Sequence, residues 1–323
     1  MSHYLPIVAA LVTILLITII LYSSLGRVIQ DIPNERSMHA VPTPRIGGVG
    51  LMAGVLCAWV LMPHSLVWWL ILPMLGLFMV SLLDDMRGLP VRWRLLAHLA
   101  AAALVIAGSG LLARYGILSA ALMLLFTVWV TNLYNFMDGS DGLAGGMTFF
   151  GFSMYGAAAL LGNNEQIAML NFSVAAAAAG FLLFNFHPAK IFMGDAGSIP
   201  LGFLAAVMGL WGWQNQLWPA WFPLLVFSTF ILDATVTLLK RGIRLEKIWQ
   251  AHREHYYQRL LMLGTGHRNT ALIEYGVMAG SGLSALWLLQ HPAATIYILL
   301  IWCVVYTLAM LLVDRIWKAH QHV

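Results

Sequence analysis

The sequence predicts an all-α fold, a polytopic bundle of about eleven transmembrane helices with the N-terminus outside and the C-terminus in the cytoplasm. Three observations predict it: the composition, the length of the apolar runs and the placement of the basic residues. Of the 323 residues, 61% are hydrophobic and 9% are charged, and the mean hydropathy is +0.82. An ordinary soluble domain carries about 25% charged residues. The composition therefore excludes a soluble enzyme, a disordered protein and a nucleic-acid-binding domain.

The apolar runs are long enough to cross a membrane, which takes a helix of about 20 residues. They show no alternation of period two, so a transmembrane barrel is excluded and a helical bundle remains. No basic segment precedes the first run and no cleavage site follows it, so we expect a retained span rather than a signal peptide. The eighth run is short and rich in glycine. The expected spans are residues 4–25, 46–63, 66–83, 95–113, 117–135, 143–161, 166–184, 199–213, 218–239, 271–289 and 293–314.

The basic residues gather on one side of this predicted membrane. With eleven spans, 16 of the 17 Lys and Arg residues fall on the side of the C-terminus, and only Arg114 falls opposite. The positive-inside rule makes that side cytoplasmic. The residues concerned are Arg27, Arg36, Arg45, Arg87, Arg92, Arg94, Lys190, Lys240, Arg241, Arg244, Lys247, Arg253, Arg259, Arg268, Arg315 and Lys318.

The expected outer connections are too short to hold a domain, at residues 63–65, 114–116, 162–165, 213–217 and 290–292. The chemistry should therefore take place at the cytoplasmic face. We expect one integral-membrane domain over residues 1–323, with catalytic loops at about 26–45, 84–94, 135–142, 185–198 and 240–270. Cys57 and Cys303 lie in apolar runs and predict neither a disulfide nor a metal site.

Two adjacent acids, Asp84 and Asp85, lie where the third span meets the cytoplasm. In the simpler interpretation they form a solvated helix end. However, a carboxylate opposes the helix dipole at a C-terminus, where Lys or Arg would be the ordinary stop. The functional interpretation is a pair that positions a divalent cation or a proton.

The motif N-x-x-N-x-x-D-G-x-D-G follows the fifth span. The spacing of three places Asn132, Asn135 and Asp138 near one face if the helix continues, and Asp141 follows in a Gly-flanked turn. Such turns are common without any function. Four amide or carboxylate groups at the mouth of an apolar span favour a site for a nucleotide, a sugar or a hydrated metal.

The segment NFHPAKIFMGDAGS at residues 185–198 ends the seventh span at Pro188. Lys190 can contact a phosphate, and Asp195 lies in a Gly-Asp-Ala-Gly turn, where Gly194 and Gly197 let the backbone approach a ligand closely. A turn rich in N–H groups beside one carboxylate suits a metal-bound diphosphate. A simple loop is the alternative.

The longest cytoplasmic loop, residues 240–269, contains His252, Arg253 and His255. A basic patch attracted to anionic lipid would explain its Lys and Arg residues but not the histidines. A zinc site is disfavoured, because no Cys or further His stands at ligand spacing. Phosphate contacts by imidazole and guanidinium fit better.

Three ionisable residues lie inside expected spans, which makes each a functional candidate. They are His98, Asp233 and Glu274. For Asp233, a pair with Lys240, Arg241 or a neighbouring Asn is the simpler interpretation. We rank all three below the loop motifs.

Together these motifs resemble the polyprenyl-phosphate N-acetylhexosamine-1-phosphate transferases of glycosyltransferase family 4. The matching pieces cover most of the chain in a specific order. They are PRIGGVG at 44–50, Asp84-Asp85, NLYNFMDGSDGLAGG at 132–146, PAKIFMGDAGS at 188–198 and HREHYYQRL at 252–260.

The resemblance implies a reaction at the cytoplasmic face of a bacterial inner membrane. A UDP-N-acetylhexosamine transfers its sugar-1-phosphate to undecaprenyl phosphate and releases UMP. The implied cofactor is Mg²⁺, for which Mn²⁺ is an expected substitute. A second copy of the chain is a further expected partner, and no nucleic acid is expected.

The family's functional residues carry over by position. Asp84 and Asp85 match its aspartate pair and Asp195 its metal-binding aspartate. The implied catalytic residues are Asp84, Asp85, Asp195, His252 and His255. The implied substrate-binding residues are Asn132, Asn135, Asp138, Asp141, Lys190 and Arg253, and the implied metal ligands are Asp195, Asn135 and Asp85.

One departure from the family bears on the donor sugar. The phospho-N-acetylmuramoyl-pentapeptide translocases carry three consecutive histidines where this chain has His-Arg-Glu-His at 252–255. The chain therefore looks more like the branch that initiates O-antigen or related surface polysaccharides, with UDP-GlcNAc, UDP-FucNAc or UDP-QuiNAc as donor. The muramoyl-pentapeptide reaction is the alternative.

Both implied reactants are anions, so we expect catalysis mainly through positioning and charge neutralisation. Asp84 is the candidate base, or it orients the lipid phosphate, and a route through a phospho-aspartate stays open. Two other classes fit the sequence less well. A proton-coupled transporter predicts acids near mid-membrane and repeat symmetry. An intramembrane aspartyl protease predicts G-x-G-D, but Phe192 stands at the first position.

Overall fold

The computed structural model describes residues 3–27, 29–31, 42–62, 67–247, 250 and 252–321, and for Leu25 and Arg27 it describes the backbone alone. Three predicted features lie outside these residues. They are the cytoplasmic Arg36, the outer connection 63–65, and parts of the predicted loops 26–45 and 240–270.

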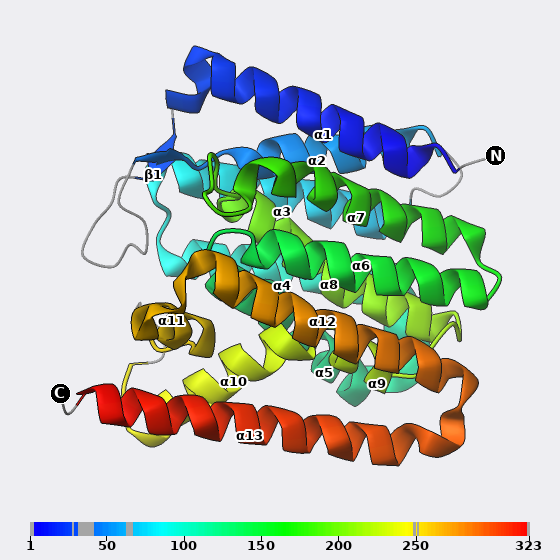
Figure 1. The fold of residues 1–323 in the computed structure, drawn as a ribbon. Helices are drawn as coiled ribbons and strands as arrows, with labels where there is room; N and C mark the ends of the chain where they lie inside the picture. The colour runs from blue at the N-terminus through cyan, green and yellow to red at the C-terminus, as the bar shows by residue number, and fades with distance from the viewer. Residues whose placement is uncertain are drawn as a thin grey trace.

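Helices make up almost all of the described chain, and they run side by side in one bundle (Figure 1). A short antiparallel pair of strands pairs Gln30 with Pro44 and Asp31 with Thr43. The helices are α1 (Leu5–Tyr22), α2 (Gly47–Val60), α3 (Trp68–Arg87), α4 (Val91–Gly108), α5 (Leu111–Phe136), α6 (Leu143–Leu161), α7 (Glu165–Asn185), α8 (Asp195–Gln214), α9 (Trp221–Val226), α10 (Ser228–Ile243), α11 (Tyr256–Leu260), α12 (Gly266–Gln290) and α13 (Thr295–Gln321), and the strands are β1 (Gln30–Asp31) and β2 (Thr43–Pro44).

The predicted all-α membrane fold is confirmed, and within the described residues each expected span contains helical structure. Within the described residues, nine helical segments are long and apolar enough to cross a membrane, whereas α2 is shorter, at 14 residues. The number of crossings and their orientation stay predictions.

The ninth expected span, 218–239, is interrupted rather than continuous. It consists of α9 and α10, which break at Phe227. Next to the break, the Ser228 hydroxyl donates to the Leu225 carbonyl at 2.7 Å. A polar side chain that satisfies a backbone carbonyl locally is a common cause of such a break. Helix α10 then continues to Ile243, beyond the expected end.

The eighth expected span, α8, is the most deeply buried helix and packs against α3 and α5. Its glycines allow this close approach. A Cβ at Gly202 would lie 2.6 Å from the Tyr134 side chain and 3.0 Å from the Thr131 backbone, both on α5. Small residues let helices pack closely where lipid supplies no hydrophobic driving force. The glycine content that made this span look weak therefore explains its central place.

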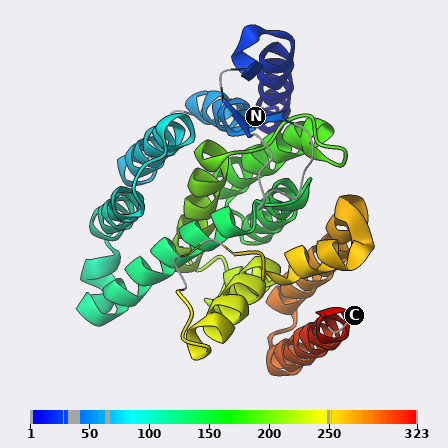
Figure 2. The ribbon, with the colours of Figure 1, turned by 90° about the vertical axis from the view of Figure 1, so that its left-hand side faces the viewer.

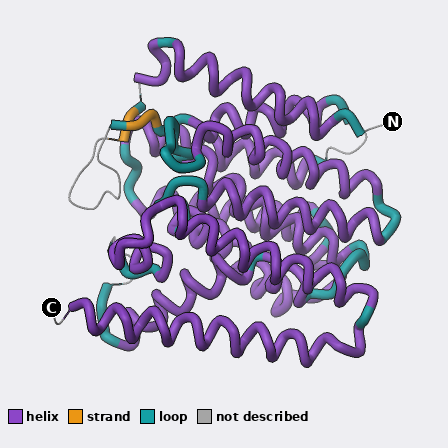
Figure 3. The backbone as a smooth tube through the Cα atoms, viewed as in Figure 1, coloured by secondary structure: helices purple, strands orange, loops and turns teal. Residues whose placement is uncertain are grey.

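The chemistry-bearing segments lie at one end of the bundle. Strand β1, helix α11 and the C-terminus mark this end, and the N-terminus lies at the other (Figure 1). Loops and the strand pair gather there in the tube view (Figure 3). Seen from that end, α1 and α13 lie at opposite margins of the bundle (Figure 2).

Candidate active site

Asp195 stands at the first turn of α8, at the centre of a group of buried carboxylates. Gly194 before it has φ +72°, and a Cβ there would lie 2.9 Å from Asp85 Oδ2. The backbone N–H groups of Asp195 and Ala196 donate to Asp85 Oδ1 and Oδ2 at 3.1 and 2.9 Å. Asp85 therefore caps the positive end of α8. This capping joins the predicted aspartate pair directly to the predicted Gly-Asp-Ala-Gly turn.

Arg45 neutralises part of this charge. Its Nη2 lies 2.5 Å from Asp195 Oδ1 and 3.3 Å from Asp85 Oδ1. Burial alone would lower the pKa of Arg45, but the two carboxylates more than offset it and raise that pKa above its usual range. Backbone N–H groups of Gly47 and Gly48 donate to the carbonyls of residues 192 and 193 at 2.9 and 2.8 Å. The segment PRIGGVG thus docks on the loop before α8.

Asp84 is held by a second guanidinium. Its Oδ1 accepts from the Leu89 N–H at 2.5 Å, and its Oδ2 accepts from Arg94 at 3.1 Å. Arg94 also lies 3.6 Å from Asp195 Oδ2. The side chains of Asp84, Asp85 and Asp195 are only 8%, 1% and 8% exposed. Three buried carboxylates thus share two arginines.

Asn135 and Asp138 join this group from the end of α5. Asn135 Nδ2 donates to Asp195 Oδ1 at 3.0 Å and to Ser198 Oγ at 2.9 Å. Burial raises the pKa of Asp138 well above its usual value, and the nearby Asp195 and Asp85 carboxylates add to this effect against the opposing charge of Arg45. The predicted contact between the two motifs is therefore present.

Asn132 does not join the carboxylate group. Its Nδ2 donates to the Val128 carbonyl at 2.7 Å, within its own helix, and its side chain is hydrogen bonded to His98. The spacing of three predicts Asn132, Asn135 and Asp138 near one face, but Asn132 is satisfied one turn deeper in the bundle.

Asp141 forms a separate polar group with two histidines. Its Oδ2 lies 2.7 Å from His187 Nδ1 and accepts from the Ala189 N–H at 3.1 Å. The rings of His187 and His267 stack with centroids 5.6 Å apart, and Ser140 Oγ lies 3.0 Å from His267 Nδ1. The sequence places Asp141 with Asp138, whereas the fold turns it toward the residues after α7.

Asn185 fastens this second group to the loop before α8. Its Oδ1 accepts from the Gly142 N–H at 3.0 Å, and its Nδ2 donates to the Ile191 carbonyl at 2.9 Å. Lys190 beside it is exposed and makes no side-chain hydrogen bond or ion pair with any residue that the structure describes. It is available to an anionic ligand.

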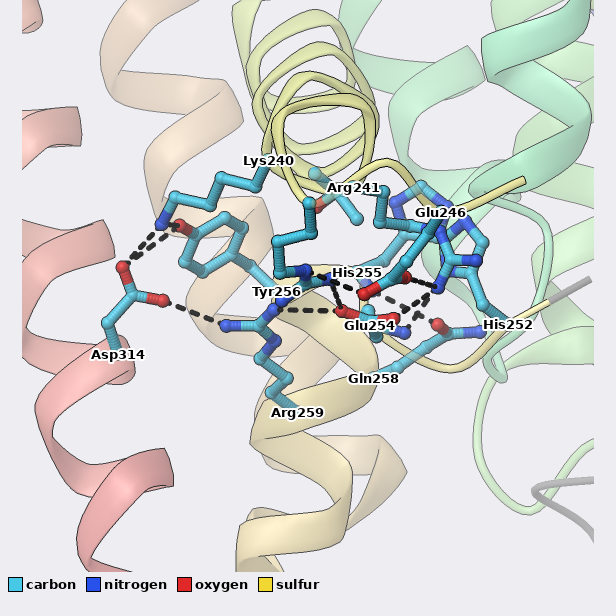
Figure 4. A network of polar contacts seen from close by, with 12 residues as sticks. Lys240, Arg241, Glu246, His252, Glu254, His255, Tyr256, Gln258, Arg259 and Asp314 are labelled. Atoms are coloured by element: carbon cyan, nitrogen blue, oxygen red, sulfur yellow. Dashed lines mark hydrogen bonds and ion pairs between the residues drawn. The ribbon is translucent and has the colours of Figure 1, made fainter. Parts of the chain in front are cut away.

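The histidine loop lies against α10 and α11 (Figure 4). His255 is 3% exposed, and its Nδ1 lies 3.2 Å from Asp233 Oδ1. His252 stands beside it, with ring centroids 4.9 Å apart, and Arg253 is half-buried. Burial lowers the pKa of His252 to about 4, and His255 and Arg241 add to the effect. His252 is therefore neutral at pH 7 and offers a phosphate a hydrogen bond rather than a charge.

Acids of the same region neutralise the basic residues around α10 and α11. Glu254 bonds Arg241 and Arg244, and Asp314 on α13 lies 2.5 Å from Lys240 and 2.8 Å from Arg259 (Figure 4). This part of the predicted basic loop is thus an internal network of ion pairs, so it offers little free charge to lipid.

Helix α11 carries the histidine loop onto the end of α5. Tyr257 Oη donates to the Phe136 carbonyl at 3.2 Å, and a Cβ at Gly139 would lie 2.2 Å from the same hydroxyl. The rings of Phe136 and His255 lie 6.3 Å apart. These contacts place the predicted histidine loop next to the segment that carries Asn135 and Asp138.

The donor set at Asp195 fits a hard cation. Mg²⁺ takes oxygen ligands, keeps several waters and needs only one or two carboxylates. Asp195 supplies a carboxylate, and Asn135 Oδ1 accepts no hydrogen bond from any described residue. Among the described residues no three His, Cys, Asp or Glu side chains converge as a metal cluster. Asp85 stays a predicted ligand, since each of its oxygens accepts one α8 amide and keeps a second lone pair.

Sequence reasoning did not single out several residues of these groups as site residues. Arg45 stands in the quoted PRIGGVG motif and Arg94 in the predicted loop 84–94, so their positions gave a signal. His187 stands in the quoted segment at 185–198, whereas His267 belongs to no quoted motif, and only the fold brings both to Asp141.

Comparison with known proteins adds the family. The sequence pattern of "Glycosyl transferase family 4" matches residues 67–212. A Bacillus subtilis protein named "Probable undecaprenyl-phosphate N-acetylglucosaminyl 1-phosphate transferase" is 30% identical over 315 residues, which cover 90% of this chain and 85% of the relative. The chain belongs to glycosyl transferase family 4.

Two further relatives lie in different branches by name. A "Decaprenyl-phosphate N-acetylglucosaminephosphotransferase" of Mycobacterium tuberculosis is 28% identical and covers 85% of this chain and 80% of the relative. A "Phospho-N-acetylmuramoyl-pentapeptide-transferase" of Lactobacillus johnsonii is 32% identical and covers 73% and 82%. The family 4 pattern at 67–212 includes Asp84, Asp85, Asn135 and Asp195, which meet at the head of α8.

Proposed function

We propose that this family 4 protein transfers an N-acetylhexosamine-1-phosphate from a UDP-sugar to undecaprenyl phosphate and releases UMP. The observation that carries the proposal is the group of buried carboxylates around Asp195, joined to Arg45, Arg94 and Asn135 at one end of a membrane bundle. The names of the relatives support a polyprenyl phosphate acceptor and a phosphosugar product.

The chain's own residues contribute mainly charge and position. Arg45 and Arg94 lie between carboxylates that would otherwise repel one another and an incoming phosphate. Lys190 is exposed and free to meet a diphosphate. Asp84, fixed by Arg94 and the Leu89 N–H, is placed to orient the lipid phosphate or to take its proton. A phosphate monoester has a second pKa of about 6, so at pH 7 much of the acceptor needs no base.

Asp195 and Asn135 would hold Mg²⁺, or Mn²⁺ in its place. The bound ion would neutralise diphosphate oxygens and stabilise charge on the departing phosphate. Asp85 would then act indirectly on the ion, because it caps α8 and so fixes the backbone of Asp195.

We propose UDP-GlcNAc as the first donor to test, since two of the compared relatives are named for N-acetylglucosamine. The initiating step of O-antigen or another surface polysaccharide, at the inner membrane with the site facing the cytoplasm, is the corresponding role. The muramoyl-pentapeptide reaction is the second candidate, because a relative named for it is 32% identical. UMP release measured over UDP-GlcNAc, UDP-FucNAc, UDP-QuiNAc and UDP-MurNAc-pentapeptide decides between them.

Asp195→Asn is the central test. It keeps the shape of the side chain but removes the charge, so UMP release from UDP-GlcNAc and undecaprenyl phosphate should fall ~100-fold or more, as when one positioned electrostatic group is lost. Purified protein in detergent with Mg²⁺ is the preparation, and released UMP is the readout.

Glu165→Gln is the matched control, because Glu165 lies at the start of α7, at the opposite end from Asp195, with its side chain 53% exposed. Near-normal turnover by the Asp195→Asn protein would contradict the assignment. A burst of UMP from wild-type protein without lipid acceptor would instead favour a phospho-aspartate route.

A further inference from the structure

Asp233 is a buried acid inside α10 that the proposed reaction does not use. It is 5% exposed, and a charge at such a place is costly unless it is paired. The simpler interpretation of the sequence paired Asp233 with Lys240, Arg241 or a neighbouring Asn, but Lys240 and Arg241 bond Asp314 and Glu254. The pairing with these two residues is wrong, because the histidine loop rather than the end of α10 reaches Asp233.

Every polar contact of Asp233 leads to the histidine loop or to its own helix. Oδ1 accepts from the Tyr256 N–H at 2.9 Å and from Thr237 Oγ1 at 3.2 Å, and Oδ2 accepts from the Tyr257 N–H at 3.0 Å. His255 Nδ1 lies 3.2 Å from Oδ1. One carboxylate therefore fixes both the start of α11 and one nitrogen of His255.

This contact decides which nitrogen of His255 carries the proton. A carboxylate that already accepts from two backbone N–H groups can only accept again, so Nδ1 must donate. In the neutral ring Nε2 then has a free lone pair. His252 has the opposite arrangement, because the Glu254 N–H donates to its Nδ1 at 3.3 Å, which leaves the proton on its Nε2.

We propose that Asp233 is a positioning residue of the active site: it holds His255 as the Nδ1–H tautomer, so that the loop presents an acceptor nitrogen on His255 beside a donor N–H on His252. The inference rests on the proposed function. The two rings are 4.9 Å apart, close enough for two oxygens of one phosphate. A phosphate that bears one proton matches a donor and an acceptor side by side.

The pair is also held in place from the other side. The Phe136 ring lies 6.3 Å from the His255 ring, and the Tyr257 ring lies 6.0 Å from it. Charged groups that act on the neighbouring His252 ring are Asp233 on α10, Glu254 on the loop and Arg241. Asp233 contacts His255 Nδ1, and the Gln258 N–H faces the same side chain in the capping box of α11, so the measured tautomer shows which of the two sets the proton.

The tautomer is measured without any enzyme assay. Protein with ¹⁵N-labelled histidine in detergent micelles should show His255 as Nδ1–H at pH 7.5, with the signal assigned by its loss in His255→Asn. In Asp233→Asn the amide can donate to Nδ1, so the signal should change to the Nε2–H form. A wild-type His255 in the Nε2–H form overturns the proposal.

Kinetics provide the second test. Asp233→Asn should lower kcat/KM for UMP release by ~10-fold to ~10⁴-fold. The lower limit is typical of losing a partner that orients a histidine, and the upper limit of reversing the tautomer of an essential histidine. The matched control is Asp314→Asn, which loosens α11 through Arg259 and Lys240 but has no contact with His255. We expect a smaller loss than for Asp233→Asn, because Asp314 contacts Arg259 and Lys240 and no atom of His255. If both variants lost the same factor in kcat/KM, Asp233 would only stabilise the position of α11, and the proposal would be overturned.

A double variant isolates the coupling. If Asp233 acts through His255, then adding Asp233→Asn to His255→Asn should cause no further loss of kcat/KM. Additive losses overturn the inference. A wild-type protein that releases UMP from no UDP-sugar would overturn the proposed function instead, and the tautomer measurement would still decide the role of Asp233.

Discussion

His252 illustrates how the environment of one residue changes its chemistry. The sequence suggests a cationic contact to phosphate, but burial and its neighbours lower the pKa of His252 to about 4. Its ring is therefore neutral in the ligand-free protein. Lys190 and the partly buried Arg253 remain the cationic candidates near the phosphates.

The lowered pKa of His252 predicts a stability cost in acid. The folded pKa of about 4 lies below the ordinary value of about 6.5, so the unfolded chain binds more protons between these pH values and stability falls as the pH decreases through that range. His252→Gln removes this cost. Relative to wild type, we expect the free energy of unfolding of the variant to rise by about 1 kcal/mol when the pH is lowered from 7.5 to 5, after discounting for solvent screening.

The measurement is the thermal unfolding midpoint of both proteins in detergent at the two pH values. His3→Gln, a change at an exposed histidine at the other end of the bundle, is the control. A difference between His252→Gln and wild type that stays constant with pH would contradict the prediction.

For single residues, the sequence predicts which residues belong to the site better than it predicts which side chains they contact. Asn135 and Asp195 were expected in one site, and Asn135 Nδ2 donates to Asp195 Oδ1 at 3.0 Å. Asp141 stood in the same motif, yet it turns to His187, because the chain bends between Asp138 and Gly142, where φ is +75°. Spacing along a helix could not predict this, since the helix ends at Phe136.

Helix α11 is the element that brings the histidine loop to the rest of the site. It is only five residues long, and Tyr257 is its central contact with the end of α5. The contact depends on Gly139, which leaves space for the tyrosine hydroxyl.

Gly139→Ala should displace α11. Its new Cβ would lie 2.2 Å from Tyr257 Oη but 3.3 Å from the next ring atom. We expect a ~10-fold loss of UMP release, in line with the large effect of small displacements in a site. Tyr257→Phe removes the clashing oxygen, so the double variant should recover most of this loss.

Tyr257→Phe alone is the control, and it should lose little, because only one hydrogen bond disappears. If the double variant were as inactive as Gly139→Ala, the clash would not be the cause. Neither α11 nor the break at Phe227 could be predicted from hydropathy, which reports apolar length rather than the polar contacts that end a helix.

In the whole molecule, the segments that carry the site and the N-terminus lie at opposite ends of the helical bundle. Strand β1, helix α11 and the C-terminus share one end, and the N-terminus lies at the other (Figure 1). Composition and the placement of Lys and Arg predicted this arrangement, because burying apolar runs in lipid leaves few other solutions. The homodimer expected from the sequence stays a prediction.

Orientation can be tested by labelling. In a Cys57→Ala/Cys303→Ala background, which removes the two exposed native thiols, Asn163→Cys should react with an impermeable maleimide in right-side-out vesicles. Lys318→Cys, near the end of α13, should react only in inside-out vesicles. The reverse pattern would place the site outside, where cytosolic UDP-sugar cannot reach it.

The contact between Arg45 and Asp195 has a consequence for how ligands assemble. The Arg45 guanidinium occupies Asp195 Oδ1, so it would compete with a divalent ion for that oxygen. An anionic nucleotide that attracted Arg45 would free this oxygen for the ion. By reciprocity, the metal would strengthen nucleotide binding by the same factor.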